Sequence, residues 1–213
     1  MKKFIKLFFV VAMAFTLTAC GGSSTDEQEK AVNSFFTDMK AANLEKMAGY
    51  MTEDGYKDVE ELQTSVDSNF SEMLNAETYG DTTAKEAQKF LNHVFERLFK
   101  STKISDVKVD GDKTTIKVKG KRILVDNLND VADSEAVKNL MTEFQENEDN
   151  KNKAMEIYLS EGEAGMMKFV MGEIAPKVFA EYSKALDGCD YEDYNAKFTL
   201  VKEDGKWLID SIE

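Results

Sequence analysis

Hydrophobic positions near the start of the chain recur at the 3.6-residue period of an amphipathic helix. One set has the i, i+3, i+4, i+7 spacing of a single buried face: Val32, Phe35, Phe36 and Met39. A start signal precedes it, because Thr25 and Gln28, or the pair one residue earlier, have the spacing of a capping box. The pattern predicts a first helix that begins near Thr25.

Three more helices are predicted before residue 100. A short helix follows Asn43, and a longer one runs from about Tyr56 to Leu74, where a loop over residues 78–82 ends it. Thr83 and Glu86 then form a second capping box. The stripe that follows is the clearest in the chain: Ala87, Phe90, Leu91, Val94, Phe95 and Leu98.

Two later segments alternate with the two-residue period of strands. In the first, residues 107–118, the turn signal Asp110-Gly111-Asp112 separates two apolar arms. In the second, residues 196–209, Glu203-Asp204-Gly205-Lys206 has the same role. Because Ile123 falls on the opposite parity from Ile116, a bulge is expected at Gly120. The two hairpins are predicted to share one antiparallel sheet.

The segment between the hairpins, residues 126–187, returns to the helical period. A polar run over 145–153 divides it, and Pro176 is expected to start a new helical turn or to kink the last helix. The predicted fold class is therefore α+β, with N-terminal helices packed on a curved antiparallel sheet of about four strands. The helical insertion lies between the two hairpins.

The first 20 residues have the parts of an export signal. Three lysines lie near the N-terminus, an apolar stretch runs from Phe4 to Leu17, and small residues follow. Leu17-Thr18-Ala19-Cys20 resembles the bacterial lipobox, which implies a signal peptide over residues 1–19 and a diacylglycerol on Cys20. Two acyl chains anchor stably, whereas one binds reversibly. The polar residues 20–29 are predicted to be a flexible tether. Together, the export signal and the lipid on Cys20 predict that the chain is held on the extracytoplasmic face of the cell membrane.

Charge limits the partners of the remaining domain, residues 30–213. The chain has a formal net charge of −13, and loss of residues 1–19 would remove three more positive charges. Such a chain is repelled by nucleic acid and by anionic membranes, so no nucleic-acid partner is expected. The membrane contact is therefore assigned to the lipid alone.

Few residues are suited to catalysis or to metal binding. His93 is the only histidine, and it lies away from the apolar stripe of its predicted helix, so we expect it at the surface. We expect no catalytic residue, metal or organic cofactor other than the lipid on Cys20. Cys189 is left either as a small packed side chain or as a redox-active or intermolecular thiol.

Two features indicate binding. Lys117, Lys119 and Lys121 occupy every second position of one predicted strand, and so form a basic stripe on one sheet face. The stripe is a candidate site for an anionic envelope polymer, lipid or acidic partner, and the alternative is that exposed or edge lysines discourage aggregation. The second feature is the methionine-rich run over residues 165–171, which serves either as core filler or as an adaptable groove.

Both ends of the chain carry a family resemblance. The opening AVNSFFTDMKAANLEKMAGYM and the closing YNAKFTLVKEDGKWLIDSIE resemble the cone-shaped α+β fold of the nuclear transport factor two-like superfamily. With the lipobox, the chain resembles small bacterial surface lipoproteins of this fold. The resemblance implies a curved sheet around helices with a concave apolar mouth, and the insertion at about 126–187 is expected to fill or cover that mouth.

Three functions follow from this resemblance, because the fold alone does not choose among them. The favoured hypothesis is a noncatalytic domain that binds a small apolar ligand or an envelope protein or polymer. An isomerase- or dehydratase-like enzyme would instead bring a carboxylate and a tyrosine together in an open cavity. Its candidates are Asp106, Tyr158, Tyr182 and Tyr194. In the third hypothesis, the chain is a structural scaffold with a filled cone.

Overall fold

The computed structural model describes residues 25–124, 131 and 134–213, and the chain divides into two compact units. The sheet unit contains residues 25–65, 95–124 and 190–213. The helical unit contains residues 66–94, 131 and 134–189, and so includes most of the predicted insertion. The leader, Cys20 and the first part of the tether lie outside the described residues.

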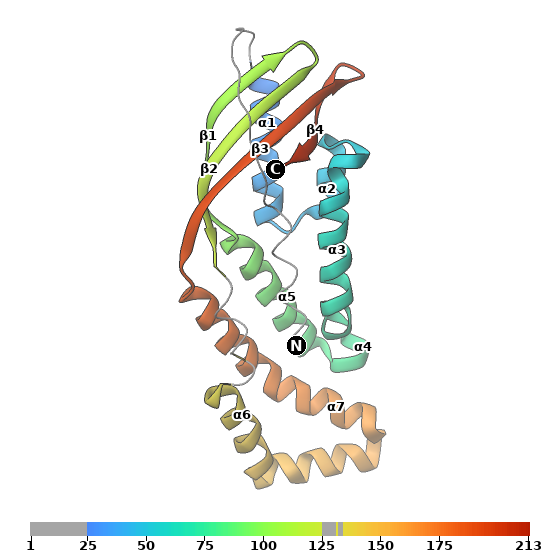
Figure 1. The fold of residues 1–213 in the computed structure, drawn as a ribbon. Coiled ribbons are helices and arrows are strands. Elements are labelled where there is room, and N and C mark those ends of the chain that lie inside the picture. The colour runs from blue at the N-terminus through green and yellow to red at the C-terminus, as the bar shows by residue number, and fades with distance from the viewer. Residues whose placement is uncertain (1–24, 125–130, 132–133) are drawn as a thin grey trace. The chain divides into compact units, whose positions relative to one another are not determined.

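Helices precede a four-stranded antiparallel sheet in the order β1-β2-β3-β4, which confirms the α+β class (Figure 1). The helices are α1 (Asp26–Lys40), α2 (Leu44–Met47), the 3-10 helix η2 (Ala48–Tyr50), α3 (Glu53–Leu74), α4 (Ala76–Tyr79), α5 (Asp81–Arg97), α6 (Glu135–Glu146) and α7 (Glu148–Asp187). The strands are β1 (Phe99–Asp110), β2 (Lys113–Ile123), β3 (Tyr191–Glu203) and β4 (Lys206–Ile212).

The two predicted hairpins do share one sheet, because β2 of the first pairs with β3 of the second over its whole length. Their turns lie where the sequence places them, at residues 111–112 and 204–205. Strand β1 begins at Phe99, well before the predicted apolar alternation at Val107. Its first half is polar or half-buried, so the hydrophobic period does not reveal it.

The bulge expected at Gly120 is wrong. The register of β2 against β3 is unbroken from Lys113 to Ile123, and the irregularities of the β1–β2 pair lie in β1, around Lys100 and Ser105. Gly120 instead permits a close approach of two strands, because a Cβ there would lie 2.0 Å from the carbonyl oxygen of Ser101. Ile123 is buried without any shift of the pleat.

The core of the sheet unit lies between α1 and one face of the sheet. Phe198 of β3 is fully buried, and its ring centroid lies 5.3 Å from that of Phe35 and 5.5 Å from that of Phe36. All three rings meet edge to face, a favoured geometry for aromatic pairs. The apolar stripe predicted for the first helix is therefore confirmed as the face of α1 that covers the sheet.

The start of α1 differs from the predicted capping box. The Thr25 side chain makes no cap hydrogen bond and donates instead to Glu29 Oε1 at 2.6 Å. Gln28 is buried, and its amide, oriented to satisfy both neighbours, donates to the Thr25 carbonyl and accepts from Trp207 Nε1, each at 3.2 Å. Gln28 thus joins α1 to β4, because a buried amide needs such partners.

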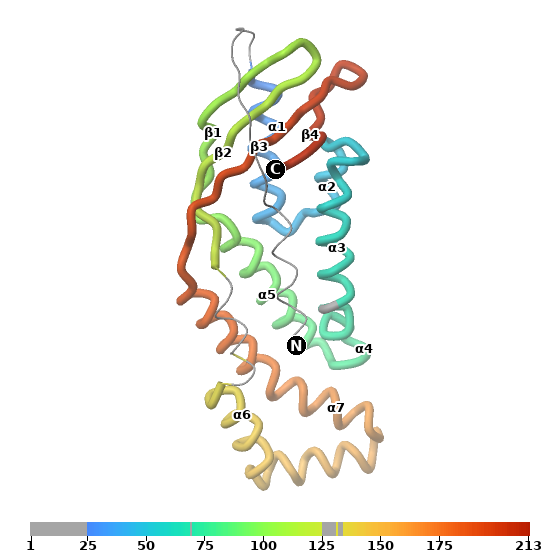
Figure 2. The backbone as a smooth tube through the Cα atoms, in the orientation of Figure 1, coloured from blue at the N-terminus to red at the C-terminus, as the bar shows by residue number. Residues whose placement is uncertain are grey.

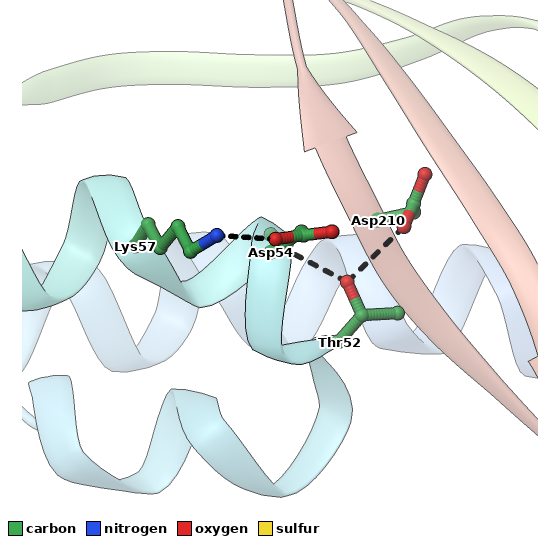
Figure 3. A network of polar contacts seen from close by, with 5 residues as sticks. Thr52, Asp54, Lys57 and Asp210 are labelled. Atoms are coloured by element: carbon green, nitrogen blue, oxygen red, sulfur yellow. Dashed lines mark hydrogen bonds and ion pairs between the residues drawn. The ribbon is translucent and has the colours of Figure 1, made fainter.

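The start of α3 is fixed to β4 by a network of polar contacts (Figure 3). The hydroxyl of Thr52 donates to Asp210 Oδ1 at 3.2 Å and accepts from the backbone N–H of Gly55 at 3.0 Å. One turn further on, Lys57 pairs with Asp54 at the surface. Thr52 therefore caps α3 and orients it on the edge of the sheet.

The helical unit contains two departures from the predicted boundaries. The predicted loop at residues 78–82 contains the end of the short helix α4 and the first residues of α5, which begins at Asp81. The capping box at Thr83 is therefore wrong, because this residue is fully buried in the first turn of α5. The stripe of α5 is confirmed as a packing face, with the Phe90 ring 5.6 Å from Phe179 and 5.7 Å from Tyr182.

Helix α7 changes direction at Gly162 rather than at Pro176, as the tube in Figure 2 shows. Gly162 has φ 74° and ψ −167°, a conformation that is accessible to glycine and strained for other residues. Pro176 lies inside the helix with helical dihedral angles. The polar run over 145–153 contains a single non-helical residue, Asn147, whose side chain accepts from the Asn150 N–H and caps α7.

Gly55 provides a test of the α3–β4 junction. A Cβ at Gly55 would lie 2.4 Å from the backbone carbonyl oxygen of Ile209, so Gly55→Ala must displace the helix or the strand. We expect a loss of about 1–3 kcal/mol in the free energy of unfolding, measured by urea titration with circular dichroism.

Gly49→Ala is the matched control, because a Cβ there meets no atom within 4 Å. It should leave stability unchanged or raise it by about 0.4–1 kcal/mol through the unfolded chain. Equal unfolding midpoints for the two variants would contradict the close packing of Gly55 against β4.

Candidate functional site

The three predicted lysines lie on β2, with β1 on one side and β3 on the other (Figure 1). Alternation along β2 directs Ile116 and Val118 into the core, where both are almost fully buried. Lys117, Lys119 and Lys121 therefore lie on the opposite face, with Lys119 and Lys121 exposed and Lys117 half-buried. The predicted stripe is thus formed, and it lies on an interior strand.

Pairing with the neighbouring strands adds three lysines to this face. Lys103 of β1 lies opposite Lys119, Lys197 of β3 lies opposite Lys117, and Lys108 lies opposite Thr115. We call the following six lysines the lysine face: Lys103, Lys108, Lys117, Lys119, Lys121 and Lys197. The sequence of a single strand does not reveal the three added lysines, because the register between strands places them on this face.

Three acidic side chains neutralise part of the lysine face. Lys121 Nζ lies 2.8 Å from Asp193 Oδ1, Lys108 Nζ lies 3.9 Å from Asp106 Oδ2, and Lys197 pairs with Glu213. The hydrogen bond and charge of Lys121 lower the pKa of the Asp193 carboxyl below its usual range. Within the part of the chain that the structure describes, Lys103 and Lys119 make no ion pair.

Two cross-strand pairs of these lysines are unfavourable for folding, although Asp106 lies opposite Lys117 and Asp193 lies opposite Lys121. Lys103 lies directly opposite Lys119, and Lys117 lies directly opposite Lys197. Like charges at such positions destabilise a sheet. Protection of an exposed edge does not explain the stripe, because β2 is paired on both sides. The arrangement therefore favours a role in binding over a role in stability.

Aromatic side chains occupy the opposite face of the sheet. Tyr194 of β3 is buried, with its ring centroid 5.0 Å from Phe99 and 6.1 Å from Phe36. Burial raises the pKa of the Tyr194 hydroxyl, because the charged form would be desolvated. With Phe35 and Phe198, these rings fill the space between α1 and the inner sheet face.

The four candidate catalytic residues of the isomerase-like hypothesis do not form one site within the sheet unit. Asp106 lies on the lysine face beside Lys108, whereas Tyr194 lies on the inner face. The other two candidates belong to the helical unit, where Tyr182 packs on Phe90. Tyr158 lies on the first part of α7 and is 48% exposed.

The single histidine and the second cysteine both have structural partners. His93 Nε2 lies 3.0 Å from Asp187 Oδ1 and the ring is partly exposed, near the surface position that its sequence predicts. Cys189 is buried, and its thiol donates to the Ala185 carbonyl at 3.3 Å. Among the described residues, no group of three or more histidine, cysteine or acidic side chains is placed to hold a metal ion.

The helical unit contains a groove of about 540 Å³ between α6 and the two parts of α7. Its lining is mainly apolar: Phe144, Gln145, Lys151, Ala154, Met155, Tyr158 and Met166. Of the methionine-rich run, Met166 is half-buried in this lining and Met167 is exposed. This part of the run therefore lines a surface groove rather than a closed core.

No protein-family model, curated protein or solved structure matches the chain. None of the helices in the described ranges has the length and hydrophobicity needed to cross a bilayer. The lysine face is the candidate site to which three separate strands, β1, β2 and β3, contribute side chains.

Lys121→Met tests the contact between Lys121 and Asp193. Loss of the ammonium group should raise the pKa of the Asp193 carboxyl towards its usual value of about 3.9, as followed by NMR titration of the side-chain carbon. Lys46→Met, on α2, removes the same charge elsewhere and should leave that pKa unchanged. The contact would be disproved if the Asp193 pKa were the same in both variants and the wild type.

Proposed function

We propose that the chain is a noncatalytic interaction domain, held on the extracytoplasmic face of the cell membrane by a lipid on Cys20, which binds an anionic polymer of the cell envelope. The observation that carries the proposal is the lysine face. Six lysines from three strands lie together in a chain of net charge −13, against three acidic side chains.

The geometry of the lysine face favours a linear ligand over a compact anion. Alternate residues of a strand lie roughly 7 Å apart, so the three lysines of β2 form a row about 14 Å long. A single phosphate would need donors that converge on one point, whereas a row of separated ammonium groups matches repeated charges along a chain. Lysine binds phosphate as a point charge. The preferred ligand is therefore a phosphate-bearing polymer.

The acidic body of the protein does not prevent this contact. Charges separated by more than about 8 Å are largely screened at physiological ionic strength, so the ligand responds mainly to the nearest side chains. Lys103 and Lys119 make no ion pair among the described residues and are available to it. We expect salt to weaken binding, because the same screening acts on these exposed contacts.

The lipid anchor is proposed from the lipobox and from the residues around it. The structure begins α1 at Asp26, so the five residues between Cys20 and this helix, residues 21–25, remain for the tether. As a flexible chain they would reach roughly 11–13 Å, enough to hold the domain just above the headgroups. An acidic chain needs such an anchor, because anionic lipids repel it. The position of Cys20 would then limit the ligand to polymers near the membrane surface.

We also propose that the sheet unit has the cone-shaped fold of the nuclear transport factor two-like superfamily. Two observations support this. Helix α1 packs on the inner sheet face. Trp207 follows the last turn of the chain, and its indole donates a hydrogen bond to Gln28 of α1. In this interpretation the aromatic rings of α1 fill the mouth of the cone. Binding would consequently move to the outer face.

The polymer-binding proposal is tested with Lys103→Glu combined with Lys119→Glu. Inorganic polyphosphate, a linear polyanion, serves as the probe in isothermal titration calorimetry at two salt concentrations. We expect the wild type to bind and the double variant to lose affinity by about tenfold or more, because each exposed charge contact contributes roughly 0.2–1 kcal/mol.

Lys46→Glu combined with Lys85→Glu is the matched control, since these exposed lysines lie on α2 and α5 and the change in net charge is the same. Its affinity should stay within about twofold of the wild type, because neither residue belongs to the lysine face. Equal losses in both double variants would reduce the effect to net charge and refute a specific site.

The anchor is tested by labelling cells with a radioactive fatty acid. The wild type should take up the label and Cys20→Ala should not, because the thioether to the lipid needs the thiol. Cys189→Ala removes the other cysteine, which is buried, and should remain labelled. Label on Cys20→Ala, or its loss from Cys189→Ala alone, would contradict anchoring through Cys20.

A further inference from the structure

The helical unit carries a segment that has no core of its own. We call residues 138–164, the end of α6 and the first part of α7, the helical arm. None of its residues is buried. It nevertheless holds nine apolar side chains: Leu140, Met141, Phe144, Ala154, Met155, Ile157, Tyr158, Leu159 and Ala164. The arm thus exposes the kind of surface that a helix normally buries.

The exposure is concentrated on one stretch of α7. Leu159 is 78% exposed and Met155 is 59% exposed, and Tyr158 lies between them. Among the described residues, the large apolar side chains that reach such exposure all belong to α6 or α7. Burial of such side chains against a partner is favourable, because it removes apolar surface from water. A patch of this kind marks an interaction surface.

The arm is held in a shape that leaves a groove open. Gly162 turns α7 back on itself, and the Phe144 ring of α6 lies 6.1 Å from Phe169 beyond the turn. Lys153 lies with its ammonium 5.0 Å from the centre of the same ring. These contacts stabilise one end of the turn, while Met155 and Tyr158 line the groove of about 540 Å³.

The negative charge of the helical arm indicates which kind of partner fits the groove. The arm contains three lysines, of which Lys151 pairs with Glu148. Its acids outnumber them: Glu143, Glu146, Glu148, Asp149, Glu156, Glu161 and Glu163. A second copy that docks through its own arm would bring the same acidic surface, and an anionic bilayer would bring negative headgroups, so both are repelled. A basic apolar partner is complementary in charge and in hydrophobicity.

We propose that the helical arm is a docking site for a cationic amphipathic helix of a partner protein. The stretch Glu148–Glu161 is about 21 Å long, which matches about four turns of a bound helix. The partner's apolar i, i+3, i+4, i+7 stripe fills the groove, and its lysines or arginines meet the acids of the arm. The methionines adapt to the shape of that stripe.

This site is independent of the lysine face. It lies in the other unit, has the opposite charge and takes a different class of partner. Failure of polyphosphate binding therefore leaves the docking proposal intact, and the reverse also holds. The Lys103→Glu and Lys119→Glu variant should bind the docking partner within about twofold of the wild type, because neither lysine belongs to the helical arm.

The test uses the full chain carrying Cys20→Ser and an 18-residue dansyl-labelled peptide of leucine and lysine with one apolar stripe. We expect saturable binding with a dissociation constant of about 1 μM, measured by fluorescence anisotropy. Two control peptides, one with the same composition but no stripe and one with glutamate in place of lysine, should bind at least about tenfold more weakly.

Matched variants of the arm separate polarity from shape. Met155→Gln with Leu159→Gln keeps size and removes apolar character, and should weaken binding by about tenfold or more. Met155→Leu with Leu159→Met keeps apolar character and should bind within about twofold of the wild type. Glu156→Lys with Glu163→Lys leaves the apolar side chains in place and should also weaken binding by about tenfold.

Three results would overturn the proposal. The first is equal binding of the striped, scrambled and acidic peptides, or of the glutamine variant and the wild type. The second is a dimer in sedimentation velocity that the glutamine variant abolishes, since the groove would then hold a second copy. The third is capture of the Cys20→Ser chain by phosphatidylglycerol vesicles through Met155 and Leu159, which would make a lipid surface the occupant.

Discussion

The edge-to-face contact of Phe35 and Phe36 with Phe198 is the interaction on which the sheet unit depends. One face of the sheet carries charged side chains, so the hydrophobic stabilisation of β2 and β3 comes from the other face. Helix α1 supplies that burial with its apolar stripe. Because the inner face is closed in this way, the outer face can carry lysines whose mutual repulsion lowers stability.

The sequence predicts the parts of this fold that depend on a local period or a turn signal. The stripe of α1, the turns at Gly111 and Gly205, and the antiparallel sheet all follow from such patterns. What it misses depends on neighbours. Gln28 has the spacing of a cap but is buried beside Trp207, and the β1 irregularities cannot be read from β2. Helix α7 turns at Gly162, which has a positive φ, and continues through Pro176 without a kink.

The candidate sites show the same division between local pattern and long-range pairing. Alternation alone locates Lys117, Lys119 and Lys121, but register adds Lys103 and Lys197 and removes the edge-strand explanation. The methionine-rich run is visible in the sequence, yet only the exposure of residues 138–164 makes the helical arm a surface. If both proposals hold, a single anchored chain has two binding surfaces: a basic sheet face, and an arm that is acidic and apolar.

The most direct measurement of the central claim is a titration of the ¹⁵N- and ¹³C-labelled chain with polyphosphate, followed by NMR. Binding at the lysine face predicts changes in the chemical shifts of Lys103 and Lys119. It also predicts a rise in the Asp193 pKa, because the ligand competes for Lys121. Shifts confined to the helical unit, or an unchanged spectrum of β1 to β3 at saturating polyphosphate, would contradict the account.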